Sequence, residues 1–208
     1  MNIKVCGMRD SANIANLCQL PINYIGFIFF AKSTRFVGED FDAMNTNLVP
    51  SHIKKVGVFV NASEQYILSK IKTYNLDAIQ LHGNESPYFC KTFANKNIEI
   101  IKAFGIDECF NFTSLNDYNE ACNYFLFDTK ALSHGGTGLK FDWTILQNYK
   151  GEKPFFLSGG ITIDDVDAIK KLTTLPIHCL DINSKFELSA AMKNIKQIER
   201  FISNFKTE

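Results

Sequence analysis

The sequence predicts an α/β fold, a (β/α)8 TIM barrel that forms a single domain over residues 1–208. Short apolar runs alternate with amphipathic stretches, and the runs are apolar on both faces, which is typical of a parallel sheet covered by helices. Eight units give about 26 residues per unit, near the lower limit for such a barrel. Polar residues and glycines gather just after the runs, and a barrel brings those loops to one rim. An open doubly wound sheet is the alternative.

Eight strands are expected where β-branched and aromatic residues lie between Gly, Asn or Pro. In chain order they cover residues 3–6, 24–30, 55–60, 78–81, 99–103, 124–128, 155–158 and 178–182. Amphipathic helices are expected between and after them at residues 11–20, 64–74, 86–94, 163–172 and 187–205. Four helix starts carry residue types that cap N-termini: Ser11, Ser63, Ser86 and Thr162. The connection at residues 106–123 has the weakest helical pattern, so the sequence leaves its structure open.

The charge balance points to a small ligand. Twenty-two basic residues match 22 acidic ones, so no overall positive field is available to hold nucleic acid or an anionic membrane. The N-terminal segment lacks the pattern of a signal peptide, and no apolar run reaches the ~20 residues that a membrane helix requires. We therefore expect neither a nucleic-acid nor a membrane partner, and a cytoplasmic protein.

The cysteines and histidines give no sign of a disulfide framework or a metal centre. The six cysteines are scattered without a C-x-x-C pair, in a chain too large to need disulfides for stability. His52, His134 and His178 show no metal-ligand spacing relative to one another or to the cysteines. We expect reduced thiols and no metal.

Cys6 ends the first expected strand and is a candidate general base. Because side chains alternate along a strand, Lys4 and Cys6 share one face, toward the barrel interior or mouth. The cation of Lys4 would favour a thiolate at Cys6. A cysteine is, however, more often a small buried apolar side chain than a reagent, so the residues alone leave both interpretations open.

Asp128 ends the sixth expected strand and is a candidate general acid. It follows the apolar residues 124–127, and a carboxyl group in apolar surroundings can keep its proton near neutral pH. The alternative roles are a cap for the next loop or an ion pair with Lys130.

Two loops are candidates for anion binding. Ser158, Gly159 and Gly160 follow the seventh expected strand, where backbone free of side chains lets amide groups approach a phosphate. The alternative is a tight turn. Arg35, after the second strand, could hold a carboxylate through two parallel hydrogen bonds or could be a solvated surface residue.

Two further features lie after strands four and six. His82 stands at the tip of the fourth strand, where it either contacts the substrate or forms local hydrogen bonds. The glycine-rich segment at residues 135–138, which includes Gly136, predicts a loop that could close on a ligand, although such segments also form simple turns.

Several stretches, in order, resemble the phosphoribosylanthranilate isomerase family. They read KVCGMRD, YIGFIFFAKSTRFV, KVGVFVN, AIQLHGNE, FLFDTKALSHGGTGLKFDW, LSGGIT and LDINSKFE, from residue 4 to residue 187. The resemblance implies an eight-stranded barrel that catalyses an Amadori rearrangement of N-(5-phosphoribosyl)anthranilate in tryptophan biosynthesis. Such chemistry needs neither a metal nor an electron sink, so no cofactor is expected.

The same resemblance assigns roles to residues of this chain. It implies that Cys6 is the general base, that Asp128 is the general acid and that Arg35 holds the anthranilate carboxylate. The phosphate-binding loops correspond to Gly159 and Gly160 after strand seven and to Asn183 and Ser184 after strand eight. His82, Gly136 and Asp181 complete the expected substrate-binding set.

This chain departs from the family pattern at Lys185. The family commonly carries glycine there, in Asp-x-Ser-Ser-Gly-x-Glu, whereas this chain reads DINSKFE from Asp181 to Glu187. Lys185 could contribute a direct charge contact to the phosphate or lie in solvent.

Other interpretations of the sequence are a related barrel that isomerises an aminoaldose, a flavin-binding oxidoreductase barrel, and a non-catalytic barrel that senses a phosphorylated ligand. Either a monomer or a homodimer is compatible with the sequence.

Overall fold

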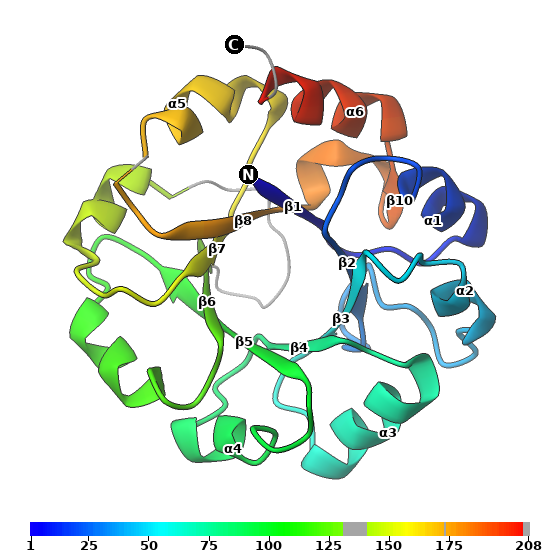
Figure 1. Ribbon diagram of the computed structural model, residues 1–208, viewed down its shortest axis with the longest axis horizontal. Helices are drawn as coiled ribbons and strands as arrows, with labels where there is room; N and C mark the ends of the chain where they lie inside the picture. The colour runs from blue at the N-terminus through cyan, green and yellow to red at the C-terminus, as the bar shows by residue number, and fades with distance from the viewer. Residues whose placement is uncertain (131–140, 173, 206–208) are drawn as a thin grey trace.

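The computed structural model describes residues 1–130, 141–172 and 174–205. Strands β1 to β8 form a closed parallel barrel in chain order, and the helices lie around its outside (Figure 1). The strands are β1 (Asn2–Val5), β2 (Tyr24–Ile28), β3 (Lys54–Phe59), β4 (Ala78–Leu81), β5 (Glu99–Ile106), β6 (Tyr124–Thr129), β7 (Phe155–Leu157) and β8 (Ile177–Ile182). The expected barrel is therefore confirmed, and the open-sheet alternative is wrong. Ile3 opposite Leu180 and Lys4 opposite Asp181 are among the pairs that close it.

The α-helices are α1 (Ser11–Leu17), α2 (Met44–Asn47), α3 (Glu64–Tyr74), α4 (Pro87–Lys91), α5 (Val166–Lys170) and α6 (Ile195–Asn204). Among the described residues, 3₁₀ helices cover Phe112–Tyr118, Trp143–Asn148, Ile163–Asp165 and Ser184–Phe186. The weakly patterned connection at residues 106–123 thus contains a 3₁₀ helix. Within the described residues, none of the helices has the length and apolar character needed to cross a membrane.

Each N-cap residue expected from the sequence is observed, except at α1. Ser63 and Ser86 each accept a hydrogen bond from the backbone three residues on, at 3.2 Å. Thr162 caps the 3₁₀ helix Ile163–Asp165, and its backbone N–H donates to Asp165 Oδ2 at 2.8 Å. Ser11 was the wrong choice for α1, because Asp10 accepts from the Asn13 backbone at 2.8 Å and takes the cap position.

The helix expected over residues 187–205 is correct only in its second half. Residues before α6 form an antiparallel hairpin of β9 (Glu187–Ser189) and β10 (Met192–Lys193). Glu187 closes the hairpin by accepting from the Ala191 backbone, and Ala191 has a φ of 65°, in the left-handed region that a helix does not use. Leu188, which the apolar pattern would place on a buried face, is 71% exposed.

The core has two parts, one on each face of the barrel strands. Inside the barrel, an apolar cluster is formed by Tyr24, Val56, Ala78, Ile101, Ala103, Leu126, Phe156 and Cys179. A larger cluster lies outside and includes Phe27, Phe59, Phe125 and Phe155. Lys4, Gln80, Lys102 and Asp181 are the buried polar side chains of strands β1, β4, β5 and β8. Burial on both faces explains why the strands read as continuous apolar runs.

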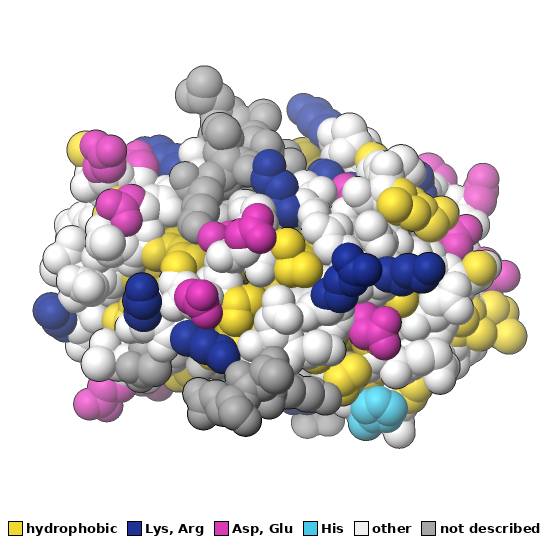
Figure 2. Space-filling view, turned by 90° about the horizontal axis from the view of Figure 1, so that it is seen from above, with side chains coloured by type: hydrophobic (Ala, Val, Ile, Leu, Met, Phe, Trp, Pro, Cys, Tyr) yellow, Lys and Arg dark blue, Asp and Glu magenta, His cyan; other side chains and the backbone are white. Residues whose placement is uncertain are grey.

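The face shown in Figure 2 carries basic and acidic side chains intermixed. This agrees with the equal numbers of basic and acidic residues in the sequence, and such mixing provides no extended field of one sign. This face therefore offers no extended surface of one sign to an anionic ligand.

Candidate active site

A cavity of about 520 Å³ opens at the carboxyl ends of the barrel strands. That end is where loops from every strand meet, and enzymes with this fold place their active sites there. The expected site residues that line the cavity are Cys6, Arg35, His82, Asp128, Gly159, Gly160, Asp181, Asn183 and Ser184. Gly136 and the glycine-rich segment at residues 135–138 lie outside the described residues. The barrel thus brings together every described residue of the expected set.

Cys6 follows the last residue of β1, and its neighbour β2 makes room for it. The side chain is 4% exposed and lines the cavity. A Cβ at Gly26 would lie 2.8 Å from Cys6 Sγ, closer than two such atoms can approach. Glycine at position 26 therefore lets the thiol sit against β2, a requirement that the sequence pattern did not reveal.

The surroundings of Cys6 oppose the thiolate form of its side chain. Burial raises the pKa of the Cys6 thiol above its ordinary value, and this effect outweighs the lowering effect of Lys4. Lys4 does favour the thiolate, as expected, but burial has the larger effect. Asp181 adds to the rise, because its Oδ2 lies 2.7 Å from Lys4 Nζ and its charge opposes that of the ammonium.

Lys4 lies inside the barrel, as the strand alternation predicted. Its ammonium is 0% exposed and donates to Gln80 Oε1 at 2.8 Å and to Asp181 Oδ2 at 2.7 Å. Burial opposes its charge, but Asp181 and Cys6 hold the pKa of Lys4 above its ordinary value. Asp181 Oδ1 is buried and has no hydrogen-bond partner among the described residues, so it can accept a hydrogen bond from a ligand.

Asp128 faces His82 across the cavity mouth. Its Oδ2 atom lies 3.4 Å from His82 Nε2, and its Oδ1 atom accepts from the Thr129 backbone at 2.8 Å. The side chain is 22% exposed, so ligand and water can reach it. Lys130 does not pair with Asp128, because its ammonium contacts Asp107 instead. The ion-pair alternative for Asp128 is therefore wrong.

Arg35 is neither free nor solvated. It is 12% exposed and holds the carboxylate of Glu187 through two nitrogens, with Nη2 2.7 Å from Oε2 and Nε 2.9 Å from Oε1. Lys193, which is 0% exposed, contacts the same carboxylate and donates to Asn183 Oδ1 at 2.6 Å. Burial works against the charge of Glu187, yet the two cations hold its pKa below the ordinary value. The expected bidentate contact exists, but with a carboxylate of the chain itself.

The two expected anion loops face the same cavity. Gly159 and Gly160 have φ values of 92° and 65°, which side chains with a Cβ rarely adopt. A Cβ at Gly159 would also lie 2.5 Å from Thr129 Oγ1, so this loop packs directly against the end of β6. Ser184 and the exposed Lys185 line the cavity from the loop after the neighbouring strand β8. Bare backbone and an ammonium on adjoining loops are suited to a phosphate.

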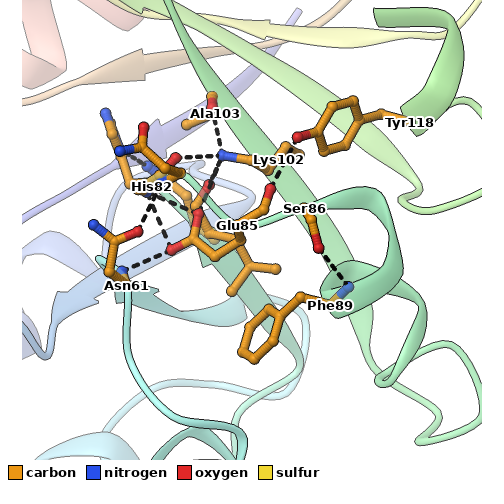
Figure 3. A network of polar contacts seen from close by, with 12 residues as sticks. Asn61, His82, Glu85, Ser86, Phe89, Lys102, Ala103 and Tyr118 are labelled. Carbon is orange, nitrogen blue, oxygen red and sulfur yellow. Dashed lines mark hydrogen bonds and ion pairs between the residues drawn. The ribbon is translucent and has the colours of Figure 1, made fainter.

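A buried polar network that the sequence did not reveal holds the loop carrying His82 (Figure 3). Glu85 accepts from the Asn61 backbone at 2.8 Å and from the Gly83 backbone at 2.9 Å. Lys102, 2% exposed, lies 3.2 Å from Glu85 and donates to the carbonyls of Leu81, Gly83 and Ala103. The sequence signal that could have revealed this network is Lys102, a charged residue in the interior of the largely apolar strand β5. The network fixes the backbone on both sides of His82.

No group of three or more His, Cys, Asp or Glu side chains that could hold a metal ion is found among the described residues. All six cysteines are unpaired, and five of them are buried.

The family described as N-(5'phosphoribosyl)anthranilate (PRA) isomerase matches residues 3–204 of the chain. The chain belongs to this family. An N-(5'-phosphoribosyl)anthranilate isomerase from Parabacteroides distasonis is 44% identical over 203 residues, covering 97% of this chain and 92% of that protein. The chain is thus an isomerase, and the membership in the phosphoribosylanthranilate isomerase family that the sequence motifs implied is confirmed.

Solved structures of phosphoribosylanthranilate isomerases share the barrel. One, determined in complex with reduced 1-(o-carboxyphenylamino)-1-deoxyribulose 5-phosphate, is 26% identical with a TM-score of 0.84, covering 99% of this chain and 98% of that one. Another, of monomers generated from a dimeric isomerase of Thermotoga maritima, is also 26% identical with a TM-score of 0.84, covering all of both chains. This chain therefore shares its fold with these relatives.

Proposed function

We propose that this chain converts N-(5'-phosphoribosyl)anthranilate into 1-(2-carboxyphenylamino)-1-deoxyribulose 5-phosphate, a step of tryptophan biosynthesis. The observation that carries the proposal is the joint placement of Cys6 and Asp128 at one cavity that also contains two loops suited to phosphate. The relative solved with the reduced product analogue adds support from outside the chain. A phosphate, a sugar and a carboxylate are the three parts that the cavity must bind.

The first step assigned to this site opens the ribose ring. The Asp128 carboxyl donates its proton to the ring oxygen, and the bond from that oxygen to C1 breaks. The nitrogen lone pair then forms a double bond to C1, which leaves a protonated imine, a hydroxyl group on the sugar and a carboxylate at Asp128. His82 Nε2, 3.4 Å from Asp128 Oδ2, is placed to support that carboxylate.

The second step moves the double bond. Cys6 as thiolate takes the proton from C2, and the electron pair of that bond forms a C1–C2 double bond while the imine nitrogen regains its lone pair. The Cys6 thiol then gives a proton to C1, and the C2 hydroxyl gives its proton to the Asp128 carboxylate, which completes the ketone and restores both groups. The protonated imine is a cation, and a cation beside a thiol lowers the thiol pKa, which offsets the effect of burial. Acid and base groups each contribute about 10²–10⁴-fold in such reactions.

The remaining residues bind the ends of the substrate. Gly159 and Gly160 present backbone to the phosphate, and Ser184 and Lys185 approach it from the other loop. The buried, unpartnered Asp181 Oδ1 is placed to accept from a sugar hydroxyl. Arg35 is held by Glu187 through Nε and Nη2, which leaves the Nη1 side of its guanidinium for the substrate carboxylate. The two anions thus bind at separate places.

The proposal is tested by a coupled assay that generates the unstable substrate and follows the loss of its fluorescence. We expect the wild-type chain to be active and Cys6→Ala to lower kcat by about 10²–10⁴-fold while KM changes little. Cys109→Ala is the matched control, because Cys109 is the exposed cysteine. A folded wild type without activity would contradict the function, and a near-normal Cys6→Ala would contradict the role of Cys6.

Two further expectations accompany the function. The unpaired state of all six cysteines supports a cytoplasmic location, where thiols stay reduced. A relative derived from a dimeric enzyme supports either a monomer or a homodimer for this chain. Sedimentation at several concentrations distinguishes the two states.

A further inference from the structure

A line of polar contacts crosses the barrel interior from Asp181 to Asp128. Asp181 accepts from Lys4 at 2.7 Å, and Lys4 donates to Gln80 Oε1 at 2.8 Å. Gln80 Nε2 lies 2.7 Å from His82 Nδ1, and His82 Nε2 lies 3.4 Å from Asp128 Oδ2. Lys4 and Gln80 are 0% and 1% exposed, so water does not compete for the contact between these two side chains.

Lys4 decides which way the Gln80 amide points. An ammonium group has donors and no acceptor, so the atom of Gln80 that faces it must be the carbonyl oxygen. A reversed amide would place two donors against each other in a buried site, which is strongly unfavourable. The Gln80 NH2 group therefore faces His82.

Gln80 in turn decides where His82 carries its proton. The NH2 group of Gln80 can only donate, so His82 Nδ1 must accept and cannot carry a proton. A neutral imidazole then carries its single proton on Nε2. A ring turned by 180° would place a carbon instead of Nδ1 in front of the Gln80 NH2 group, so the loss of this contact opposes the turn.

We propose that Gln80, held by Lys4, is a positioning residue that fixes neutral His82 in the tautomer whose Nε2–H faces Asp128. In this state His82 presents a donor to Asp128 and stabilises the carboxylate form that the acid reaches after it gives up its proton. The role of Asp128 as acid rests on the proposed function, whereas the tautomer follows from the contacts alone. Without Gln80, His82 could carry its proton on Nδ1 and would then face the Asp128 carboxylate with an unprotonated Nε2, which is an acceptor.

The tautomer is measured directly by nitrogen NMR on the full chain labelled with ¹⁵N at histidine. The chain has four histidines, and the His82 signals are assigned from their loss in His82→Asn. At about pH 8, above the ordinary histidine pKa of ~6.5, we expect an unprotonated Nδ1 and a protonated Nε2. A wild-type His82 with its proton on Nδ1 would overturn the inference.

Gln80→Glu reverses the direction of the contact with little change in shape. A carboxylate at position 80 accepts from Lys4 and also from His82, which moves the His82 proton to Nδ1 and turns an acceptor toward Asp128. We expect kcat to fall by about 10–100-fold, the range for lost partners that orient a catalytic group, with KM changed less. Gln65→Glu on α3 is the matched control, because Gln65 is exposed and receives the same added charge.

Gln80→Met serves as a second variant that adds no buried charge. Methionine cannot donate to Nδ1, so we expect His82 to lose its single tautomer and kcat to fall in the same direction. An unchanged tautomer in both variants, or an unchanged kcat once the tautomer has moved, would contradict the role of Gln80. An inactive wild type would contradict the proposed function, whereas an active wild type with the Nδ1–H tautomer would contradict this inference alone.

Discussion

Cys6 and Asp128 reach one cavity from β1 and β6, and their surroundings differ. Cys6 is 4% exposed beneath the mouth, and burial raises the pKa of its thiol. Asp128 is 22% exposed and lies beside His82. The two groups therefore differ in how readily solvent and ligand can reach them.

Asp128→Asn tests the acid. An amide cannot give up a proton to the ring oxygen, so we expect kcat to fall by about 10²–10⁴-fold with KM little changed. The coupled fluorescence assay measures both constants. Asp117→Asn, an exposed change of the same kind in the 3₁₀ helix Phe112–Tyr118, should leave them unaltered. A kcat for Asp128→Asn within a few-fold of wild type would remove Asp128 from the mechanism.

Lys185→Ala tests the departure of this chain from the family pattern. Lys185 is exposed and lines the cavity beside Ser184. If its ammonium contacts the phosphate, we expect KM to rise about tenfold, which corresponds to ~1.4 kcal/mol, with kcat preserved. Lys196→Ala on α6 is the control, because Lys196 is exposed. An unaltered KM in Lys185→Ala would show that the phosphate is held by backbone and Ser184.

The β9–β10 hairpin is the element that departs most from the sequence expectation. Its first residue, Glu187, carries the carboxylate that Arg35 and Lys193 share, and Lys193 belongs to β10. The Lys193 backbone also accepts from and donates to Asn13 in α1, at 3.0 and 2.8 Å. The hairpin therefore ties the loop after β8 to Arg35 on one side and to α1 on the other.

Glu187→Gln is expected to destabilise this element strongly. The neutral amide would leave Arg35 and the fully buried Lys193 close together without a compensating charge, and such a loss costs about 3–5 kcal/mol. Urea unfolding measures the free energy of unfolding. Glu199→Gln on α6, where the side chain is exposed, should change it by less than about 0.5 kcal/mol. Equal stabilities for the two variants would show that the Glu187 network adds nothing.

Across the whole molecule, an apolar cluster fills the barrel and the polar chemistry lies at its carboxyl end. The cavity of about 520 Å³ lies at the mouth, beyond this filled interior. The same dense packing buries five of the six cysteines. Burial raises the pKa of the Cys90 thiol to about 11 and that of Cys122 to about 12.

Because the pKa values of these buried thiols are raised, we expect the free energy of unfolding to decrease at alkaline pH. The unfolded chain releases thiol protons near the ordinary pKa of ~8.5, whereas the folded chain keeps them to a higher pH, so the free energy of unfolding decreases as pH rises above ~8.5. Each thiol contributes a slope of up to about 1.4 kcal/mol per pH unit until its folded pKa is reached.

Urea unfolding between about pH 7 and pH 10 measures this slope. Cys122→Ala should make it shallower, whereas Cys109→Ala, at the exposed cysteine, should leave it unchanged. Parallel slopes for wild type and Cys122→Ala would contradict the prediction.

The sequence determined the barrel and the composition of its rim. Apolar runs bounded by turn residues fixed eight strands, and the order of the chain placed Cys6, Asp128 and Gly159 at or just after strand ends, where a parallel barrel must gather them. These features depend on local pattern, so they could be predicted without coordinates.

Only the tertiary structure decided how the gathered residues pair. The partners of Lys4 are 76 and 177 residues away, and Glu187 is 152 residues from Arg35. Closure of the barrel sets these distances and also the burial that turns the pKa of Cys6 upward. Local pattern could not predict them, because a hydrogen bond, an ion pair or a desolvated thiol depends on which distant groups share its space.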